Sequence, residues 1–146
     1  MEIYTIGFTQ TPAAEFFGKL KSVGVRRLVD VRLRNTSQLA SYAKRDDLTF
    51  FLRAICDADY EHEPLLAPTQ ELLDAFKKHK GSWQEYEDKF LALMAERRIE
   101  QRLDREQFER TPTVLLCSEP TAEHCHRRLV LEYLAKPWPE VVAVHL

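Results

Sequence analysis

The sequence has no long apolar run and no leader-like beginning. Its 146 residues contain no stretch that approaches the roughly 20 apolar residues of a membrane-spanning helix. The first residues, MEIYTIGFTQ, lack the basic segment and the apolar run of a secretory signal peptide. We therefore expect a cytoplasmic protein with no membrane partner.

Cysteine and net charge are also scarce. The chain has 3 cysteines, an odd number with no export signal, so we expect reduced thiols. The formal net charge of -2 argues against a surface that binds polyanions everywhere, although it allows a local basic patch. Because the sequence contains no Gly-rich phosphate loop, no HExxH and no G-x-S-x-G element, we expect no cofactor and no metal.

The residues that are present suit one compact domain spanning residues 1–146. Apolar residues make up 45% of the chain and charged residues 30%, which is typical of a globular protein. A chain of this length can bury roughly two thirds of its unfolded surface. The sequence shows no repeat, low-complexity segment or linker that would divide it.

Strand-like and helical patterns alternate along the chain. Apolar and β-branched runs predict strands at 2–6, 26–32, 111–118 and 140–146, and a short extended segment at 59–68. Apolar residues at helical spacing predict helices at 11–24, 46–58, 69–79, 81–103 and 120–136. The strand–helix–strand unit at the start favours parallel strands. We therefore predict a three-layer α/β domain, with an open, mostly parallel sheet of about five strands and helices on both faces.

Two details of these helices matter below. Thr69 and Ser82 stand where N-terminal caps are expected. The aromatic side chains of Trp83, Tyr86 and Phe90 recur at the helical period, so we interpret them as core rather than as a stacking platform for bases.

Polar side chains follow three predicted strands at the point where each strand ends. Gly7 and Thr9 follow the first strand, Arg32 and Ser37 follow the second, and Cys117 and Glu119 follow the third. Sites in open parallel sheets form outside the carboxyl ends of the strands, so these residues are expected at one edge. Asp30 lies inside the second strand and needs a partner there, because an unpaired buried carboxylate is costly. Arg32 projects on the same face, and their pair is either structural or part of the site.

The stretch LLCSEPTAEHCHRRL, residues 115–129, concentrates reactive side chains. Cys117 ends a buried strand, and Cys125 is expected in the first or second turn of the next helix, where the helix N-terminus and nearby basic groups lower a thiol pKa. Glu119 is either a helix cap or a proton acceptor, and His126 is either a core histidine or a catalytic group. The cluster is therefore a candidate site, although each residue alone has an ordinary structural explanation.

Three kinds of chemistry fit this cluster. One cysteine is a thiolate nucleophile, with Glu119 or His126 handling protons and arginines holding an anionic substrate. Alternatively, Cys117 and Cys125 form a reversible disulfide. Zinc binding by Cys117, Cys125 and His126 is the least favoured, because successive helical residues point about 100° apart.

The motifs YTIGFT, LVDVR and LLCSEPTAEHCHRRL resemble the family called domain of unknown function 488. The resemblance spans nearly the whole chain, and its C-x-E followed by C-H-R is the most specific part. The matching positions are Thr5, Ile6, Gly7, Thr9, Asp30, Val31, Arg32, Ser37, Cys117, Glu119, Cys125, His126, Arg127 and His145. Two positions depart from the family pattern: Phe8 stands where the family has His, and Thr9 replaces Ser but keeps a hydroxyl. The resemblance implies an α/β fold, a bacterial or archaeal cytosolic protein and a shared site, but no activity.

Our leading hypothesis from the sequence is a small enzyme or anion-binding protein. Its catalytic residues would be Cys117, Glu119, Cys125 and His126, and its anion-binding residues would be Gly7, Thr9, Asp30, Arg32, Ser37 and Arg127, with a phosphate or carboxylate as the bound group. The alternatives are a redox sensor that uses the two cysteines of the cluster, and a nucleic-acid or protein interaction module without catalysis. The basic surface of that module would comprise Arg26, Arg27, Arg32, Arg34, Lys44 and Arg45.

Overall fold

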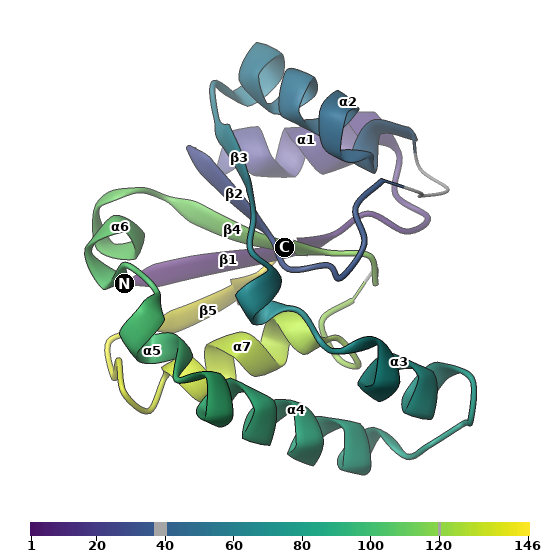
Figure 1. The fold of residues 1–146 in the computed structure, drawn as a ribbon. Helices are drawn as coiled ribbons and strands as arrows, with labels where there is room; N and C mark the ends of the chain where they lie inside the picture. The colour runs from purple at the N-terminus through teal and green to yellow at the C-terminus, as the bar shows by residue number, and fades with distance from the viewer. Residues whose placement is uncertain (37–40, 120) are drawn as a thin grey trace.

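A five-stranded parallel sheet forms the centre of the protein (Figure 1). The computed structural model describes residues 1–36, 41–119 and 121–146. The strands are β1 (Glu2–Gly7), β2 (Arg27–Asp30), β3 (Asp59–His62), β4 (Thr113–Cys117) and β5 (Val142–His145). Their order is β3-β2-β4-β1-β5, and every neighbouring pair is parallel. The predicted single α/β domain with a parallel sheet is confirmed.

Seven α-helices flank the sheet in the described part of the chain. They are α1 (Ala13–Ser22), α2 (Arg45–Phe51), α3 (Gln70–Lys77), α4 (Trp83–Arg97), α5 (Ile99–Arg102), α6 (Arg105–Arg110) and α7 (His126–Leu134). Short 3-10 turns occur at Ser41–Ala43 and Pro64–Leu66, and a π-helical turn at Leu52–Cys56 continues α2. Helices α1 and α2 lie on one side of the sheet, and α4 and α7 lie on the other (Figure 1).

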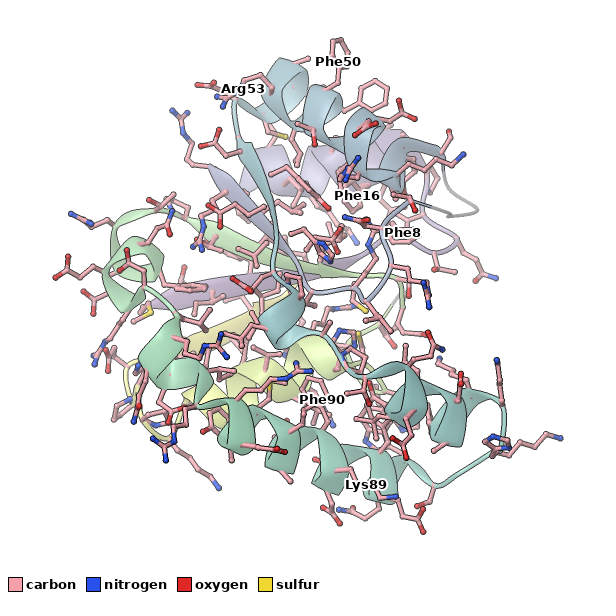
Figure 2. All side chains as sticks on the ribbon, viewed as in Figure 1. Phe8, Phe16, Phe50, Arg53, Lys89 and Phe90 are labelled. Carbon is pink, nitrogen blue, oxygen red and sulfur yellow. The ribbon has the colours of Figure 1, made fainter. Side chains whose placement is uncertain are left out.

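Each face of the sheet carries its own apolar core, because successive strand residues point to opposite faces. In β4, Val114 and Leu116 pack into the core with the α1 side, whereas Leu115 and Cys117 pack into the core with the α4 and α7 side. Figure 2 shows Phe16 of α1 and Phe90 of α4 on opposite sides of the sheet. Cys117 therefore faces α4 and α7.

The helix starts were predicted with mixed success. Thr69 caps α3 by accepting a hydrogen bond from the Leu72 N–H at 3.1 Å, and Ser82 caps α4 by accepting one from Glu85 at 3.1 Å. Helix α7 begins at His126 rather than near residue 120, and Cys125 precedes it with an extended backbone (φ -135°, ψ 138°). The prediction that Cys125 lies within the first turns of the helix is wrong, because the polar segment before it does not continue the helix.

The long predicted helix at 81–103 is interrupted. Arg98 takes a left-handed conformation (φ 52°), so α4 ends there and the short α5 follows. The sequence did not predict α6, whose six residues are too few to show a clear period. Among the described residues, none of the helices combines the length and the apolar character that a bilayer crossing requires.

Candidate functional site

A cavity of about 230 Å³ opens at the carboxyl edge of the sheet, beyond β2 and β4. Helices α3 and α4 and the segment between β4 and α7 supply the rest of its wall. The lining residues are Arg32, Leu33, Arg34, Pro68, Gln70, Leu73, Phe76, Lys77, Trp83, Tyr86, Cys117, Ser118, Glu119, His124, Cys125 and His126. Five predicted site residues are among them: Arg32, Cys117, Glu119, Cys125 and His126.

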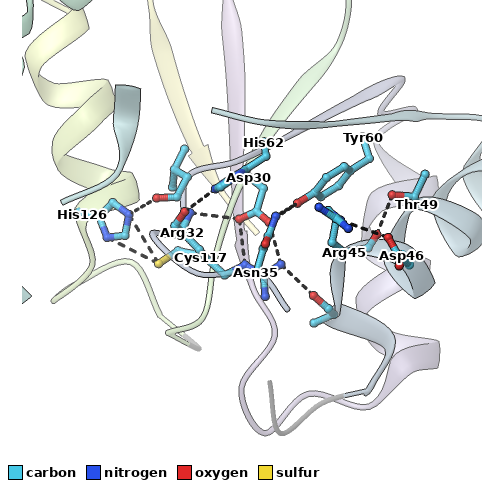
Figure 3. A network of polar contacts seen from close by, with 12 residues as sticks. Asp30, Arg32, Asn35, Arg45, Asp46, Thr49, Tyr60, His62, Cys117 and His126 are labelled. Atoms are coloured by element: carbon cyan, nitrogen blue, oxygen red, sulfur yellow. Dashed lines mark hydrogen bonds and ion pairs between the residues drawn. The ribbon is translucent and has the colours of Figure 1, made fainter. Parts of the chain in front are cut away.

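Cys117 and His126 form a thiol–imidazole pair at this cavity (Figure 3). The Cys117 Sγ lies 3.6 Å from Nδ1 and 3.9 Å from Nε2 of His126. Nε2 also lies 2.7 Å from the carbonyl oxygen of Val31, the residue after β2. Because a carbonyl oxygen only accepts, Nε2 carries a hydrogen and donates it, which leaves Nδ1 to face the sulfur. The backbone after β2 thus orients the ring toward the end of β4.

Cys125 completes the group, and the pKa values of its thiol and of the Cys117 thiol are shifted in opposite directions. The pKa of Cys117 is lowered well below its ordinary value, first because the Cys125 thiol donates a hydrogen bond to its sulfur; burial opposes this effect, and the charge of His126 reinforces it. Burial and the neighbouring Cys117 raise the pKa of Cys125. Burial opposes protonation of His126, but the Cys117 thiolate outweighs burial and raises the pKa of the imidazole. These shifts favour ionisation of Cys117 before Cys125 and favour the protonated form of His126.

Arg32 is held by a buried carboxylate and keeps one free donor. Asp30 accepts from Arg32 Nε at 2.9 Å and from Nη2 at 2.7 Å, and the Ala43 carbonyl accepts from Nη2 at 2.8 Å. Tyr60 donates a further hydrogen bond to Asp30 at 2.6 Å (Figure 3). Nη1 has no hydrogen-bond partner among the described residues, and the Arg32 side chain is only 4% exposed. Because Arg32 lines the cavity, its guanidinium places positive charge at this wall.

Arg127 and Gly7 both contact the backbone of the segment after β4. Arg127 is fully buried, and its Nη1 donates to the Glu119 carbonyl at 2.6 Å. A Cβ on Gly7 would overlap that carbonyl oxygen and lie 2.8 Å from Nη1, so only glycine allows this approach. Arg127 does not line the cavity, and its hydrogen bond supports the segment after β4. The Glu119 carboxylate instead reaches Lys77 of α3, whose Nζ lies 2.8 Å away.

Thr9 and His145 were also predicted to belong to the site, but neither lines the cavity. The Thr9 N–H donates to the Ser118 carbonyl at 3.0 Å, so Thr9 acts on the segment through its backbone. His145 lies at the end of β5, where its Nδ1 is 2.6 Å from the buried Thr5 hydroxyl. Ser37 falls outside the residues that the structure describes.

The same sulfur and nitrogen atoms are suitably placed for a metal ion. The ligand atoms of Cys117, Cys125 and His126 all lie within 4.8 Å of one another, and all three residues are buried. Tetrahedral zinc with Zn–S near 2.3 Å and Zn–N near 2.0 Å separates such atoms by about 3.5 Å, close to the observed Cys117–His126 distance. The helical-geometry argument against zinc does not hold, because Cys125 precedes α7 instead of lying in it.

The predicted basic surface is largely neutralised. Carboxylates pair with four of its six members: Arg26 with Asp57, Arg27 with Glu61, Arg32 with Asp30 and Arg45 with Asp46. Two of these arginines, Arg27 and Arg32, are buried. These contacts give no support to a nucleic-acid interface.

Sequence reasoning missed the part of the cavity that α3 and α4 provide. Lys77, Phe76, Trp83 and Tyr86 line it, although Tyr86 is also buried in the core as expected. The only signal for Lys77 was its place at the end of a helix that follows a strand, a position shared with many surface lysines. The link to the site required the tertiary fold.

Comparison with curated proteins and with solved structures finds no match. A family model matches residues 12–134, which include β2, β4, α7 and all the cavity-lining residues named above. This match covers most of the chain. The chain therefore belongs to the family described as domain of unknown function DUF488.

Proposed function

We propose that this protein is a small thiol-dependent enzyme that acts on an anionic substrate. Cys117 is the nucleophile, His126 is its proton partner, and Arg32 holds the anionic group of the substrate. The observation that carries the proposal is the position of His126, with Nδ1 3.6 Å from the Cys117 sulfur and Nε2 2.7 Å from the Val31 carbonyl. A nucleophile, a base and a group that orients the base are the parts that activated cysteines require.

In this proposal the Cys117 thiolate attacks an electrophilic atom of the substrate and displaces a leaving group. The imidazolium of His126 then supplies the proton that the leaving group needs. Arg32 Nη1 binds the substrate anion, and Asp30 fixes the guanidinium through two hydrogen bonds. Lys77 adds positive charge at the cavity, and Glu119 holds Lys77 there.

The remaining predicted anion-binding residues have supporting roles in this proposal. Gly7 and Arg127 fix the Glu119 carbonyl, and the Thr9 N–H fixes the Ser118 carbonyl. Both contacts act on the segment that links Cys117 to Cys125. Among the predicted anion-binding residues that the structure describes, we therefore assign contact with the substrate to Arg32 alone.

Alkylation with two reagents tests the proposal. Iodoacetate and iodoacetamide differ in charge, so their rates at Cys117 report both the thiolate and the anion site. We expect Cys117 to react at pH values well below 8.5, the pKa of a free thiol, and to favour iodoacetate more than a free cysteine does. Cys56 is the internal reference, because burial raises the pKa of that thiol. If Cys117 is labelled only at pH values at or above the pKa of a free thiol, the nucleophile role is refuted.

A soft-metal site is the second candidate, favoured by the close grouping of Cys117, Cys125 and His126. Zinc bound there would keep a fourth position for substrate or water and would block alkylation of Cys117. Elemental analysis of protein purified without chelators decides between the candidates. One zinc per chain, lost in Cys125→Ser, would favour the metal centre over the nucleophile.

A further inference from the structure

The second buried thiol of the site is not used by the proposed nucleophilic step. Cys125 lines the same cavity as Cys117, and the two sulfur atoms lie within 4.8 Å of one another. Both cysteines are free; Cys125 is 2% exposed and Cys117 is 4% exposed. The third cysteine, Cys56, packs on the opposite core with α1 and α2. Two thiols therefore share one cavity.

We propose that this site reduces small carboxylate-bearing disulfides by thiol–disulfide exchange, with Cys117 as the attacking thiolate and Cys125 as the resolving thiol. This inference rests on the proposed function, because it uses the same nucleophile and the same anion site. It adds the substrate class and gives Cys125 a chemical role.

Both steps of the exchange are balanced. The Cys117 thiolate attacks one sulfur of the substrate R–S–S–R, a new S–S bond forms, the substrate S–S bond breaks, and R–S⁻ leaves with a proton from His126. Cys125 then loses its proton and attacks the Cys117 sulfur, which forms the Cys117–Cys125 disulfide and releases the second R–S⁻, protonated to R–SH. The substrate disulfide is reduced to two thiols, and the protein dithiol is oxidised to a disulfide.

The backbone around Cys125 suits the second step. Cys125 precedes α7 with an extended conformation, and the segment from Ser118 to Cys125 contains neither helix nor strand where it is described. A disulfide requires the two sulfurs to approach to about 2.05 Å. The Cys125 N–H donates to the Ala122 carbonyl at 3.3 Å, and the Arg128 N–H donates to the Cys125 carbonyl at 3.2 Å. Both bonds join near neighbours in the chain, so Cys125 can shift together with the irregular segment while Cys117 stays in β4.

The charge and the shape of the cavity select the substrate. Three basic side chains line the cavity, Arg32, Arg34 and Lys77, against one carboxylate, Glu119, which pairs with Lys77. An anionic end is therefore favoured over a cationic one. Leu73 and Phe76 give the cavity an apolar side against which a short hydrocarbon arm can pack. A disulfide whose sulfurs are joined by short methylene arms to carboxylates matches these features.

Three disulfides of similar size provide the test. 3,3'-Dithiodipropionate, 2-hydroxyethyl disulfide and cystamine carry carboxylate, hydroxyl and ammonium ends, respectively. Each is mixed with reduced Cys56→Ser protein at low ionic strength, and the products are followed by intact-mass spectrometry and thiol release. Rates are divided by those of N-acetylcysteinamide, a thiol without a carboxylate, with the same reagents, which removes differences in intrinsic reactivity.

We expect the protein to lose two hydrogens and release two thiols per dithiodipropionate. With Cys125→Ser added, the reaction should stop at a mixed disulfide on Cys117, and with Cys117→Ser it should not start. The normalised rate should be about tenfold higher for the carboxylate than for the ammonium reagent. Lys77→Gln should reduce this preference, whereas Lys78→Gln, on the same helix end but outside the cavity, should leave it unchanged.

Three outcomes would overturn the inference. If dithiodipropionate leaves no adduct on Cys117 in the Cys125→Ser variant while iodoacetate still alkylates Cys117 below the pH of a free thiol, the exchange reaction fails and the proposed function stands. If the mixed disulfide forms but Cys125 never resolves it, the dithiol mechanism fails. If neither reagent modifies Cys117, both proposals fail together.

Discussion

His126 faces the sulfur of Cys117 because the Val31 carbonyl holds its other ring nitrogen. Nε2 donates to that oxygen at 2.7 Å, and Nδ1 lies 3.6 Å from the sulfur. The three residues come from the end of β2, the end of β4 and the start of α7. Parallel strands bring these ends to one edge, so the fold itself assembles the pair.

Removal of the imidazole should weaken Cys117 as a nucleophile. In His126→Ala the thiolate loses a positive neighbour, so the pKa of Cys117 should rise toward the value of a free thiol. At pH 7 the thiolate fraction then falls, by about tenfold for each unit of the rise. The measurement is the iodoacetamide labelling rate of Cys117 from pH 5 to 9. His79→Ala is the control, because His79 is exposed and lies outside the cavity; equal pH profiles for both variants would contradict the pairing.

Lys77 should matter for charge selectivity and little for stability. Its ion pair with Glu119 is partly exposed, with side chains 53% and 37% accessible, and such pairs contribute about 0–1 kcal/mol. Lys77→Gln should leave the urea midpoint almost unchanged but lower the iodoacetate rate at Cys117 a few-fold, with less effect on iodoacetamide. Lys78→Gln is the matched control, since Lys78 pairs with Asp74 away from the cavity. A similar loss in both variants would indicate a general charge effect only.

Tyr60 should contribute to stability through the buried carboxylate that fixes Arg32. Its hydroxyl donates to Asp30 at 2.6 Å, and hydrogen bonds to charged groups contribute about 1.5–3 kcal/mol. Tyr60→Phe should lower the free energy of unfolding by about that amount. Tyr4→Phe provides the comparison, because the Tyr4 hydroxyl donates to Glu2 on the surface and its loss should cost less than about 0.5 kcal/mol. Equal effects in urea titrations would show that Asp30 does not depend on Tyr60.

The sequence predicted the sheet and the edge at which the candidate site residues gather, because both follow from local patterns. Strand periodicity and the β-α-β order sufficed for the parallel arrangement and for the shared position of Arg32, Cys117 and Glu119. The sequence could not show that Cys125 precedes the helix, because a polar segment before a helix has no fixed period. Nor could it show that Val31 orients His126, since that contact joins residues 95 positions apart through a backbone oxygen.

The sequence placed Arg127 at the anion site and did not identify Lys77, whereas in the structure Lys77 lines the cavity and Arg127 does not. Tertiary packing again explains the difference. Both are basic residues near the motif or at a helix end, and the sequence favoured Arg127 because it follows His126 directly. In the fold, Arg127 is fully buried and donates a hydrogen bond to the Glu119 carbonyl, whereas Lys77 lines the cavity from α3. Which basic side chain faces the cavity depends on packing between helices that sequence periodicity does not determine.

Gly7 should tolerate no side chain, because the Glu119 carbonyl occupies the space that a Cβ would need. A Cβ there would overlap the Glu119 carbonyl oxygen and crowd Arg127 Nη1, so Gly7→Ala should force the segment after β4 to move. Such overpacking costs about 1–3 kcal/mol, measurable as a lower urea midpoint. Because this segment joins Cys117 to Cys125, the labelling rate of Cys117 should change as well.

Gly18→Ala is the matched control, and it should act in the opposite direction. Gly18 lies within α1, and a Cβ there meets no atom within 4 Å. Alanine in a helix interior is favoured over glycine by about 0.5–1 kcal/mol, so this variant should be slightly more stable, and Cys117 should be labelled as in the unmodified protein. If Gly7→Ala were as stable as Gly18→Ala, the close packing of β1 against the Glu119 carbonyl could not be what positions the thiols.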